Sequence, residues 1–427
     1  MTDGPDRQAR DELQRRLGTG DAVVIGLGSM IGAGIFAALA PAAAAAGSSM
    51  LIGVAAAALV AYFNATSTAR CAARYPESGG AYVYGRRQLG EFWGYLAGWG
   101  FVVGKTASCA AMALVVGSYA WPAHAHLVAV AAVLTLTAIN YTGIRKSLWV
   151  TRVIVAVVLT TLAGVAAVAL KAPQSDLGRI EISSGAGIHG VLQATGLLFF
   201  AFAGYARIAT LGEEVRDPSR TIRRAVPTAL GIALIVYAVV AIAVLAALGS
   251  SRLARSVAPI ADAVGAAGAA GWEPVVRIVA VLAALGSLLS LILGVSRTTF
   301  AMARDHYLPQ QLSAVHPTFT TPYRAEVAVG IAVAVLAGTA EIRGAIGFSS
   351  FAVLVYYAIA NASAWTLGAR IVPALGVTGC VVVALALPLM SVVTGLAALL
   401  AGAAVYQLRR CRSAGPPRAS GQKKNPA

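Results

Sequence analysis

The stretch GLGSMIGAGIF, residues 26–36, decides the fold, because it places Gly26, Gly28, Gly32 and Gly34 inside an apolar run. Three structures use such a glycine cluster. A dinucleotide-binding turn needs G-x-G-x-x-G between a strand and a helix, whereas the spacing here is G-x-G-x-x-x-G-x-G. The other two are a close contact between membrane helices through a GxxxG pair and a helix interrupted to expose its backbone to a ligand. The amino-acid composition of the chain helps to decide among these three interpretations.

The composition is that of a membrane protein. Of 427 residues, 58% are hydrophobic and 12% are charged, against roughly 25% charged in a typical soluble domain. Between Asp21 and Arg70 there is no Asp, Glu, Lys, Arg or His, and only Pro41 and the turn at 47–49 interrupt the run. At roughly 20 apolar residues for each bilayer crossing, this stretch predicts two spanning helices. We therefore predict an all-α membrane protein.

Apolar segments continue along the chain. Twelve are predicted, with the last four the least sharply bounded: 22–46, 50–69, 92–119, 122–142, 148–170, 188–211, 228–249, 275–296, 325–340, 344–364, 371–387 and 389–406. An even number places both termini on the same side. The first twenty residues are charged throughout, so no cleaved signal peptide is expected.

The distribution of Lys and Arg predicts which side that is. With a cytoplasmic N-terminus, most of the 33 Lys and Arg residues fall in cytoplasmic segments. Two lie within the membrane, Lys105 and Arg207, and the outer loops carry only Lys171, Arg179, Arg252, Arg255, Arg277 and Arg343. This asymmetry predicts a multi-pass protein of the plasma (inner) membrane with both termini cytoplasmic. It also accounts for the net charge of +16 without a nucleic-acid partner.

The interrupted segments suggest an internal repeat. Transporters built from inverted repeats carry Gly- or Pro-broken helices at corresponding positions of their halves. Segment six reads LQATGLLFFAFAGYARIATLGEE, with Gly196 and Gly204 inside it. We predict a cytoplasmic segment, a transmembrane domain and a basic tail, over 1–20, 21–406 and 407–427. Within the domain we expect repeat one over about 21–170, repeat two over about 188–364, and two extra helices over about 371–406.

Broken helices can bind a ligand through their backbone. Backbone that is not hydrogen-bonded within a helix is tolerated in a bilayer only where it is buried in protein or lines a cavity. Amide groups freed at Ser29–Gly34 would suit a carboxylate, and carbonyls freed at Ala201–Gly204 would suit an ammonium group. Together they would bind the common part of an α-amino acid. The alternative is that these glycines only pack helices together.

At this point the chain resembles a known family, the amino acid–polyamine–organocation (APC) superfamily of amino acid permeases. The likeness covers about residues 20–330 and rests on four motifs in order: GLGSMIGAGIF at 26–36, RYPESGGAYVYGRRQLGEFWGYLAGW at 74–99, FFAFAGYARIATLGEEVRDPSRTIRRAV at 199–226 and SRTTFAMARDHYLP at 296–309. The resemblance implies about 12 transmembrane helices in a five-plus-five inverted repeat (LeuT-like), with discontinuous helices 1 and 6. The activity it implies is transport of amino acids.

The resemblance also implies substrate contacts in both broken helices. These are Ser29, Met30, Ile31, Gly32, Ala33 and Gly34 in the first, and Phe199, Phe202, Ala203, Gly204 and Tyr205 in the sixth. Phe202 would be an aromatic lid over the bound side chain, or else a packed core aromatic. In the family's R-D-G loop, His306 stands at the glycine position.

Two charges in the predicted membrane region need a role, because a charged group there costs at least about 2.5–3.5 kcal/mol. Lys105 falls near the middle of the third helix. It could bind and release a coupling proton, bond structurally to carbonyls of a broken helix, or contact substrate. Arg207 follows the break in segment six, and we expect either a gate salt bridge with Glu213 or Glu214, or a substrate role.

The coupling ion is predicted by comparison with the family. Many proton-coupled members carry a lysine in the fifth helix, where this chain has Val155–Val158, so Lys105 would have to replace it. Sodium coupling would instead use hydroxyl groups such as those of Ser287 and Ser290, although serines in apolar helices commonly bond to their own backbone. Without an Asp or Glu in the predicted cavity, a second positive charge on the substrate would lack a partner. This favours neutral amino acids over cationic ones.

These observations predict a secondary active transporter that works by alternating access, a proton-coupled symporter of a small neutral amino acid. An amino acid exchanger, or antiporter, and a sodium-coupled symporter are the alternatives within the class, and a membrane sensor or channel is the alternative outside it. The expected partners are the amino acid and the lipid bilayer. No enzyme motif, cofactor or metal-ligand spacing is found in the sequence: the cysteines are Cys71, Cys109, Cys380 and Cys411.

Overall fold

The computed structural model describes residues 17–75, 79–143, 148–181, 184–209, 215–319, 321–368 and 370–413. Within these ranges the chain is helical, and its only β feature is one parallel bridge between Leu17 and Val215. The predicted all-α class is therefore confirmed. Most of the predicted N-terminal segment, most of the predicted tail, and Glu213 and Glu214 lie outside the described residues.

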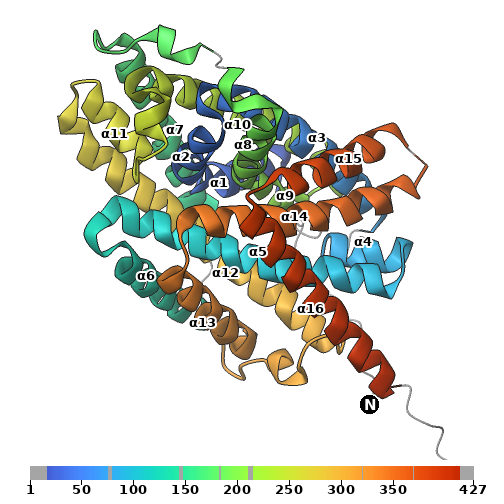
Figure 1. Cartoon of the computed structure of the whole chain (residues 1–427). Coiled ribbons are helices and arrows are strands. Elements are labelled where there is room, and N and C mark those ends of the chain that lie inside the picture. The colour runs from blue at the N-terminus through green and yellow to red at the C-terminus, as the bar shows by residue number, and fades with distance from the viewer. Residues whose placement is uncertain are drawn as a thin grey trace, which may run out of the picture.

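The first half of the bundle (Figure 1) contains α1 (Thr19–Met30), α2 (Gly34–Ala46), α3 (Met50–Arg74), α4 (Ala81–Gln88), α5 (Glu91–Ala120), α6 (Ala125–Tyr141) and α7 (Leu148–Lys171). The rest contains α8 (Gly187–Phe202), the 3₁₀ turn η6 (Ala203–Tyr205), α9 (Ala206–Ala209), α10 (Pro218–Leu253), α11 (Pro259–Ala266), α12 (Glu273–Arg304), α13 (Tyr323–Thr339), α14 (Ile342–Trp365), α15 (Ile371–Ala386) and α16 (Leu389–Ser413).

Nine helical stretches among the described residues are long and apolar enough to cross a membrane. One of them, Gly34–Arg74, contains α2, which is the second half of the predicted segment 22–46, and α3, the predicted segment 50–69; Gly47, with a φ of 57°, separates the two helices. The other two segments missing from the count are the short helices α13, with 17 residues, and α15, with 16. The structure thus contains helices at the predicted apolar segments, but not every one of these helices is long enough to count as a membrane span.

Both predicted interruptions are present. The first segment stops being helical after Met30 and resumes at Gly34. The sixth changes from α8 to a 3₁₀ turn at Ala203 before the short helix α9. The breaks pack against each other backbone to backbone, since a Cβ added at Gly204 would lie 2.4 Å from the Ser29 carbonyl oxygen. Contact this close is possible only for glycine.

Glycine packing, the alternative interpretation of the first motif, is present as well. A Cβ at Gly28 would come within 3.2 Å of Thr151 on α7, and a Cβ at Gly26 would overlap Ile208 on α9. Gly26 and Gly28 therefore bring α1 close to its neighbours, while Gly34 and Gly204 let the two breaks meet. The cluster serves packing and interruption together.

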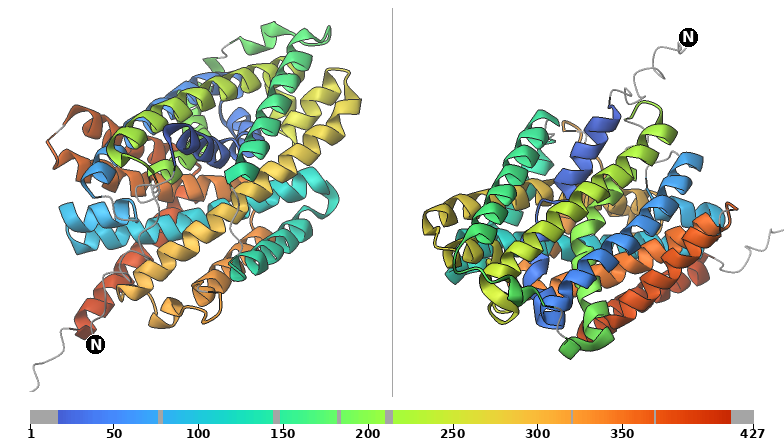
Figure 2. Two further views of the ribbon diagram at one scale, coloured as in Figure 1. Left: turned by 180° about the vertical axis from the view of Figure 1, so that it is seen from behind. Right: turned by 90° about the horizontal axis from the view of Figure 1, so that it is seen from above.

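Around the breaks, α5 and α12 cross the middle of the bundle side by side, and α14 packs along α5 (Figures 1 and 2). Helices α6 and α13 form a pair on one flank, and α15 packs against α3 and α14. Helix α16 continues to Ser413, seven residues past its predicted end, and Tyr406 packs against the rings of Phe92 and Tyr95. The first residues of the predicted basic tail are therefore helical.

Candidate functional site

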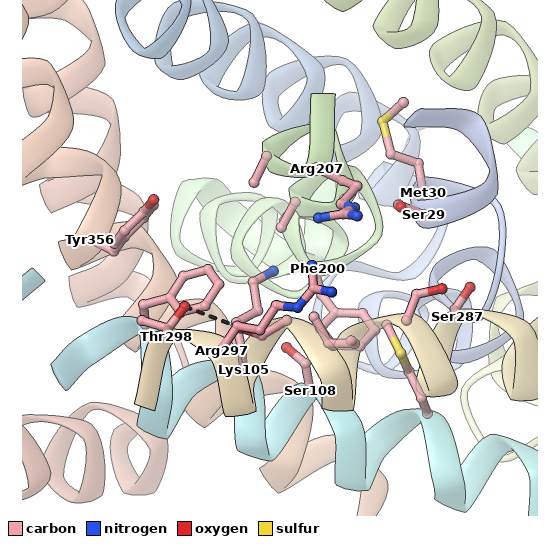
Figure 3. Close-up of a pocket in the computed structure, with 18 of the residues that line it drawn as sticks. Ser29, Met30, Lys105, Ser108, Phe200, Arg207, Ser287, Arg297, Thr298 and Tyr356 are labelled. Carbon is pink, nitrogen blue, oxygen red and sulfur yellow. Dashed lines mark hydrogen bonds between the residues drawn. The ribbon is translucent and has the colours of Figure 1, made fainter. Parts of the chain in front are cut away.

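A cavity of about 250 Å³ lies where the two interrupted helices meet. The backbone breaks supply part of its wall through Ser29, Met30, Gly34, Ala203 and Gly204. Helices α5 and α12 form another part, as Figure 3 shows. The cavity therefore has polar backbone on one side and side chains from two long helices on the other.

The α5 wall is one face of a single helix. Phe101, Lys105, Ser108 and Met112 all line the cavity, and their spacing of three or four residues places them one above the other. Lys105 is 6% exposed, and no described residue forms a hydrogen bond or ion pair with it. The sequence correctly placed this lysine inside the bundle, and the structure adds that it lines the cavity.

The cavity extends toward one end of the bundle only. It reaches Gly79 and Tyr82 near α4 and Ala301 near the end of α12. At the opposite end the Phe36 and Tyr119 rings pack edge to face with centroids 5.6 Å apart, and the Tyr119 hydroxyl accepts a hydrogen bond from the Ile260 amide at 3.4 Å. Among the described residues none from α11 lines the cavity.

A polar cluster lies at the end that the cavity approaches. The Tyr82 hydroxyl donates to Asp305 Oδ2 at 2.5 Å, and Arg86 forms an ion pair with the same oxygen at 2.6 Å. Burial, and then the bond to Asp305, raises the pKa of the Tyr82 hydroxyl above its ordinary value. The cluster ties α4 to the end of α12.

Of the predicted substrate contacts in the first break, Ser29, Met30 and Gly34 line the cavity, whereas Ile31, Gly32 and Ala33 do not. Ile31 is 2% exposed and Ala33 is fully buried. Gly32 packs directly against α12, since a Cβ there would lie 1.6 Å from Ser287 Oγ. These three residues therefore shape the break without lining the cavity.

The aromatic residues of the sixth segment differ from the prediction. Phe199, Phe202 and Tyr205 are fully buried and do not line the cavity, whereas Phe200 does. Phe202 packs on the Tyr237 ring at 4.9 Å, and Tyr205 stacks on Tyr357 at 5.2 Å. In this structure Phe202 is thus a packed core aromatic, because successive residues of α8 point about 100° apart and it is Phe200 that faces inward.

Tyr237 was not predicted as part of the site. Its hydroxyl lies 2.6 Å from the Met30 carbonyl oxygen and 3.0 Å from that of Ala201, so one donor connects the ends of both broken helices. A sequence signal existed, because Tyr237 is the only polar side chain between Thr228 and Ser250. A lone hydroxyl in such an apolar run is expected to have a buried partner.

The two serines considered for sodium differ from each other. The Ser287 hydroxyl donates across to the Gly28 carbonyl at 3.0 Å, so it connects α12 to α1. The Ser290 hydroxyl donates to the Gly286 carbonyl of its own helix at 3.1 Å, as expected for a serine in an apolar helix. Both serines line the cavity.

Two further cations line the cavity. Arg207 does so, as its position after the break suggested. Arg297 does as well, although the loop count assigned it to a cytoplasmic segment; helix α12 runs on to Arg304 and carries it inside. Figure 3 shows the side chains of Lys105, Arg207 and Arg297 directed into the same space.

Glu326 is a buried acid that the sequence analysis did not single out. It is 1% exposed in the first turn of α13 and accepts a hydrogen bond from Ser296 Oγ. Its Oε1 atom has no hydrogen-bond partner among the described residues. It does not line the cavity. A carboxyl within a predicted membrane segment, 325–340, was the signal that could have identified it.

The fold and the site define a class of protein, a multi-pass membrane transporter with a cavity at two broken helices. A sequence model of amino acid permeases matches residues 17–408. The chain belongs to this amino acid permease family, within the APC superfamily, and is a transporter rather than an enzyme. Family membership implies a LeuT-like fold.

Curated relatives span most of the chain. An uncharacterized transporter of Mycobacterium tuberculosis is 67% identical over 410 residues, which cover 95% of this chain and 93% of the relative. The branched-chain amino acid permease BcaP of Bacillus subtilis is 26% identical over 434 residues, 93% of each chain. The human cationic amino acid transporter 4 is 28% identical over 378 residues, 82% of this chain and 59% of the relative.

Proposed function

We propose that this protein carries an amino acid across the plasma (inner) membrane by alternating access, with the substrate bound in the cavity between the two broken helices. The observation that carries the proposal is the position of that cavity. It is lined by Ser29 and Gly34 from one break and by Ala203 and Gly204 from the other. Amide groups at the start of α2 suit the carboxylate of an α-amino acid, and carbonyls near the break in the sixth segment suit its ammonium group.

Twelve spans in two inverted repeats form part of the proposal, with the repeat and tail boundaries given under Sequence analysis. Both termini are cytoplasmic in this arrangement. The cavity then extends from the middle of the membrane toward the cytoplasm, because Tyr82 and Ala301 lie on that side. The structure would accordingly be an inward-facing state of the cycle.

Phosphatase fusions test this topology. A phosphatase that is active only outside the cytoplasm should be active when fused after Trp121 and inactive when fused after Gln88.

For coupling we favour a proton. Lys105 is the buried ionisable group in the cavity wall, and the fifth helix offers only Val155–Val158 at the position where many family members carry a lysine. Sodium coupling, the alternative, would use the hydroxyl oxygens of Ser287 and Ser290, which keep their lone pairs for a cation while they donate their protons to backbone carbonyls. Exchange of one amino acid for another, without net ion movement, is the other alternative.

The named relatives differ in the substrates that their names give. One is described as a branched-chain amino acid permease and another as a cationic amino acid transporter, and these substrates differ in charge. The prediction of a neutral substrate was made by excluding cationic amino acids, which would lack an acidic partner in the cavity. The positive charges of Arg207 and Arg297, together with that of Lys105, strengthen this argument against cationic substrates.

The deciding experiment is uptake of labelled amino acids into proteoliposomes that contain the full-length protein. Uptake is compared under an inward proton gradient, an inward sodium gradient, and internal amino acid alone. Acceleration by the proton gradient supports a symporter, and dependence on internal amino acid indicates an exchanger. Uptake that depends on sodium, and that loses this dependence in Ser287→Ala, would mean that sodium rather than a proton is the coupling ion. Failure to move any amino acid, while the protein remains monodisperse, would overturn the proposed function.

A further inference from the structure

The unusual feature of this cavity is a buried ammonium group with no partner among the described residues. Lys105 is 6% exposed and lines the cavity from α5. No described residue gives it a hydrogen bond or an ion pair. A buried charge without a partner is costly. From this placement we infer that the substrate is an acidic amino acid, whose side-chain carboxylate is bound by Lys105; the inference rests on the proposed function and gives that site its substrate class.

The rest of the wall has the same sign of charge. Arg207 and Arg297 line the cavity together with Lys105, and the described lining residues include no Asp or Glu. Arg297 lies near enough to Glu326 to influence that carboxyl electrostatically, so part of its charge is balanced outside the cavity. Among the described residues no such acid contributes around Lys105, where the nearby ionisable group is Cys109. An anion in the cavity therefore gains most from Lys105.

Hydroxyl groups in the cavity offer few free donors. Ser287 donates to the Gly28 carbonyl, Ser290 to the Gly286 carbonyl, and Thr298 to the Gly294 carbonyl at 3.1 Å. Ser108, one turn from Lys105, shares its hydroxyl with Ser349 at 2.5 Å. A hydroxyl has one proton to donate, so these four have already used theirs. Among the described residues, the ammonium N–H groups of Lys105 are the strongest donors left in the wall, and they favour a carboxylate over a neutral amide.

The geometry divides the substrate into two parts. The backbone of the breaks lies on one side of the cavity, and Lys105 lies on the α5 side, as Figure 3 shows. The breaks would bind the α-carboxylate and α-ammonium groups that all amino acids share. Lys105 would then read the side chain. A cationic side chain would be repelled there, and an uncharged one would leave the ammonium group without a partner.

The test compares each acid with its own amide, which has almost the same size and shape. Wild-type protein in proteoliposomes is given labelled glutamate and glutamine, then aspartate and asparagine, with the membrane potential clamped to zero because the substrates differ in charge. We expect the acids to be taken up at least tenfold more efficiently than their amides. Equal or better uptake of the amides would overturn the inference and leave the proposed function standing. Failure to transport any amino acid would be a failure of the proposed function itself.

Variants then assign the preference to one residue. Lys105→Met should lower the acid-to-amide ratio at least tenfold, and Lys105→Arg should keep most of it. Lys171→Met, at the exposed end of α7, is the matched control and should change nothing. An unchanged ratio in a well-folded Lys105→Met protein would overturn the role of Lys105. If Lys105→Met is not monodisperse, the wild-type ratio and the Lys105→Arg ratio decide.

Discussion

At the scale of single residues, the two breaks can meet because Gly204 has no side chain. A Cβ placed there would lie 2.4 Å from the Ser29 carbonyl oxygen, which belongs to backbone and cannot rotate away. This is the kind of contact that sequence reasoning can predict from a glycine in an apolar helix, although the atom on the other side is known only from the structure.

We therefore predict that Gly204→Ala is destabilised by about 1–3 kcal/mol through overpacking and loses most of its transport. Thermal unfolding in detergent and uptake into proteoliposomes measure the two effects. Gly231→Ala is the control, since a Cβ at this position of helix α10 would have nothing within 4 Å of it. That variant should gain up to about 1 kcal/mol. Equal behaviour of the two variants would contradict the packing argument.

His306 is a departure from the family motif. In the R-D-G loop of the family this position is glycine, and here His306 adopts a left-handed φ of 63°. Left-handed backbone costs a residue with a side chain roughly 1–2 kcal/mol. The ring is held by Gln310, whose amide nitrogen lies 2.7 Å from Nδ1.

His306→Gly should therefore raise the stability of the protein, by about 1 kcal/mol once the exposed Gln310 contact is lost. Thermal unfolding in detergent checks this. Ala314→Gly, in the same connection but at an ordinary φ of −74°, should instead lower stability by about 0.4–1 kcal/mol. A lower melting temperature for His306→Gly would show that the ring contact outweighs the backbone strain.

At the scale of helices, Tyr237 couples the two breaks through α10. Its hydroxyl lies within hydrogen-bond distance of the Met30 and Ala201 carbonyls. Removing the hydroxyl leaves buried acceptors without this donor, which costs about 1–3 kcal/mol. We predict this loss for Tyr237→Phe in thermal unfolding, together with slower transport. Tyr62→Phe, whose ring is exposed on α3, should stay within about 0.5 kcal/mol of wild type. A Tyr237→Phe protein as stable as Tyr62→Phe would contradict the coupling.

The sequence predicted where each helix is interrupted, because glycines in an apolar run mark either a break or a close helix contact, and here they make both. It did not predict which aromatic of α8 faces the cavity, Phe200 or Phe202, because both lie in a segment that is apolar on every side. In a soluble protein a polar face would have fixed the rotation of the helix. Tyr237 escaped prediction because the two carbonyls it faces come from distant parts of the chain. Arg297 escaped because the predicted segment ended at residue 296, whereas α12 continues to Arg304.

At the scale of the whole molecule, α1 and α7 are joined at their exposed ends by an ion pair between Asp21 and Arg152. The Gly18 amide donates to Asp21 at 3.0 Å, and this bond, together with Arg152, holds the pKa of the Asp21 carboxyl below its ordinary value of 3.8. Because the pKa of Asp21 is lower in the folded protein than in the unfolded chain, the ionised carboxylate stabilises the folded state at pH values above the unfolded pKa. That stabilisation is lost as the pH falls through the folded pKa.

The Asp21→Asn variant should therefore have a lower unfolding temperature than wild type at neutral pH. The difference between the two unfolding temperatures should narrow once the pH falls under about 3.8. Unfolding temperatures in detergent between pH 7 and pH 3 measure it, and the difference between the two proteins removes the contribution of every other carboxyl group. A gap that stays constant over this range would mean that Asp21 acts through something other than its charge.

The hydroxyl of Tyr237 carries one proton but faces two carbonyl oxygens, at 2.6 and 3.0 Å. It can satisfy only one of them fully at any instant. If α1 and α8 slide past each other by a few tenths of an ångström, the proton can turn from one oxygen to the other, so that a bond is exchanged and none is lost. Such a swivel would let the two broken helices move at little enthalpic cost, whereas a rigid pair of separate bonds would hold them in place.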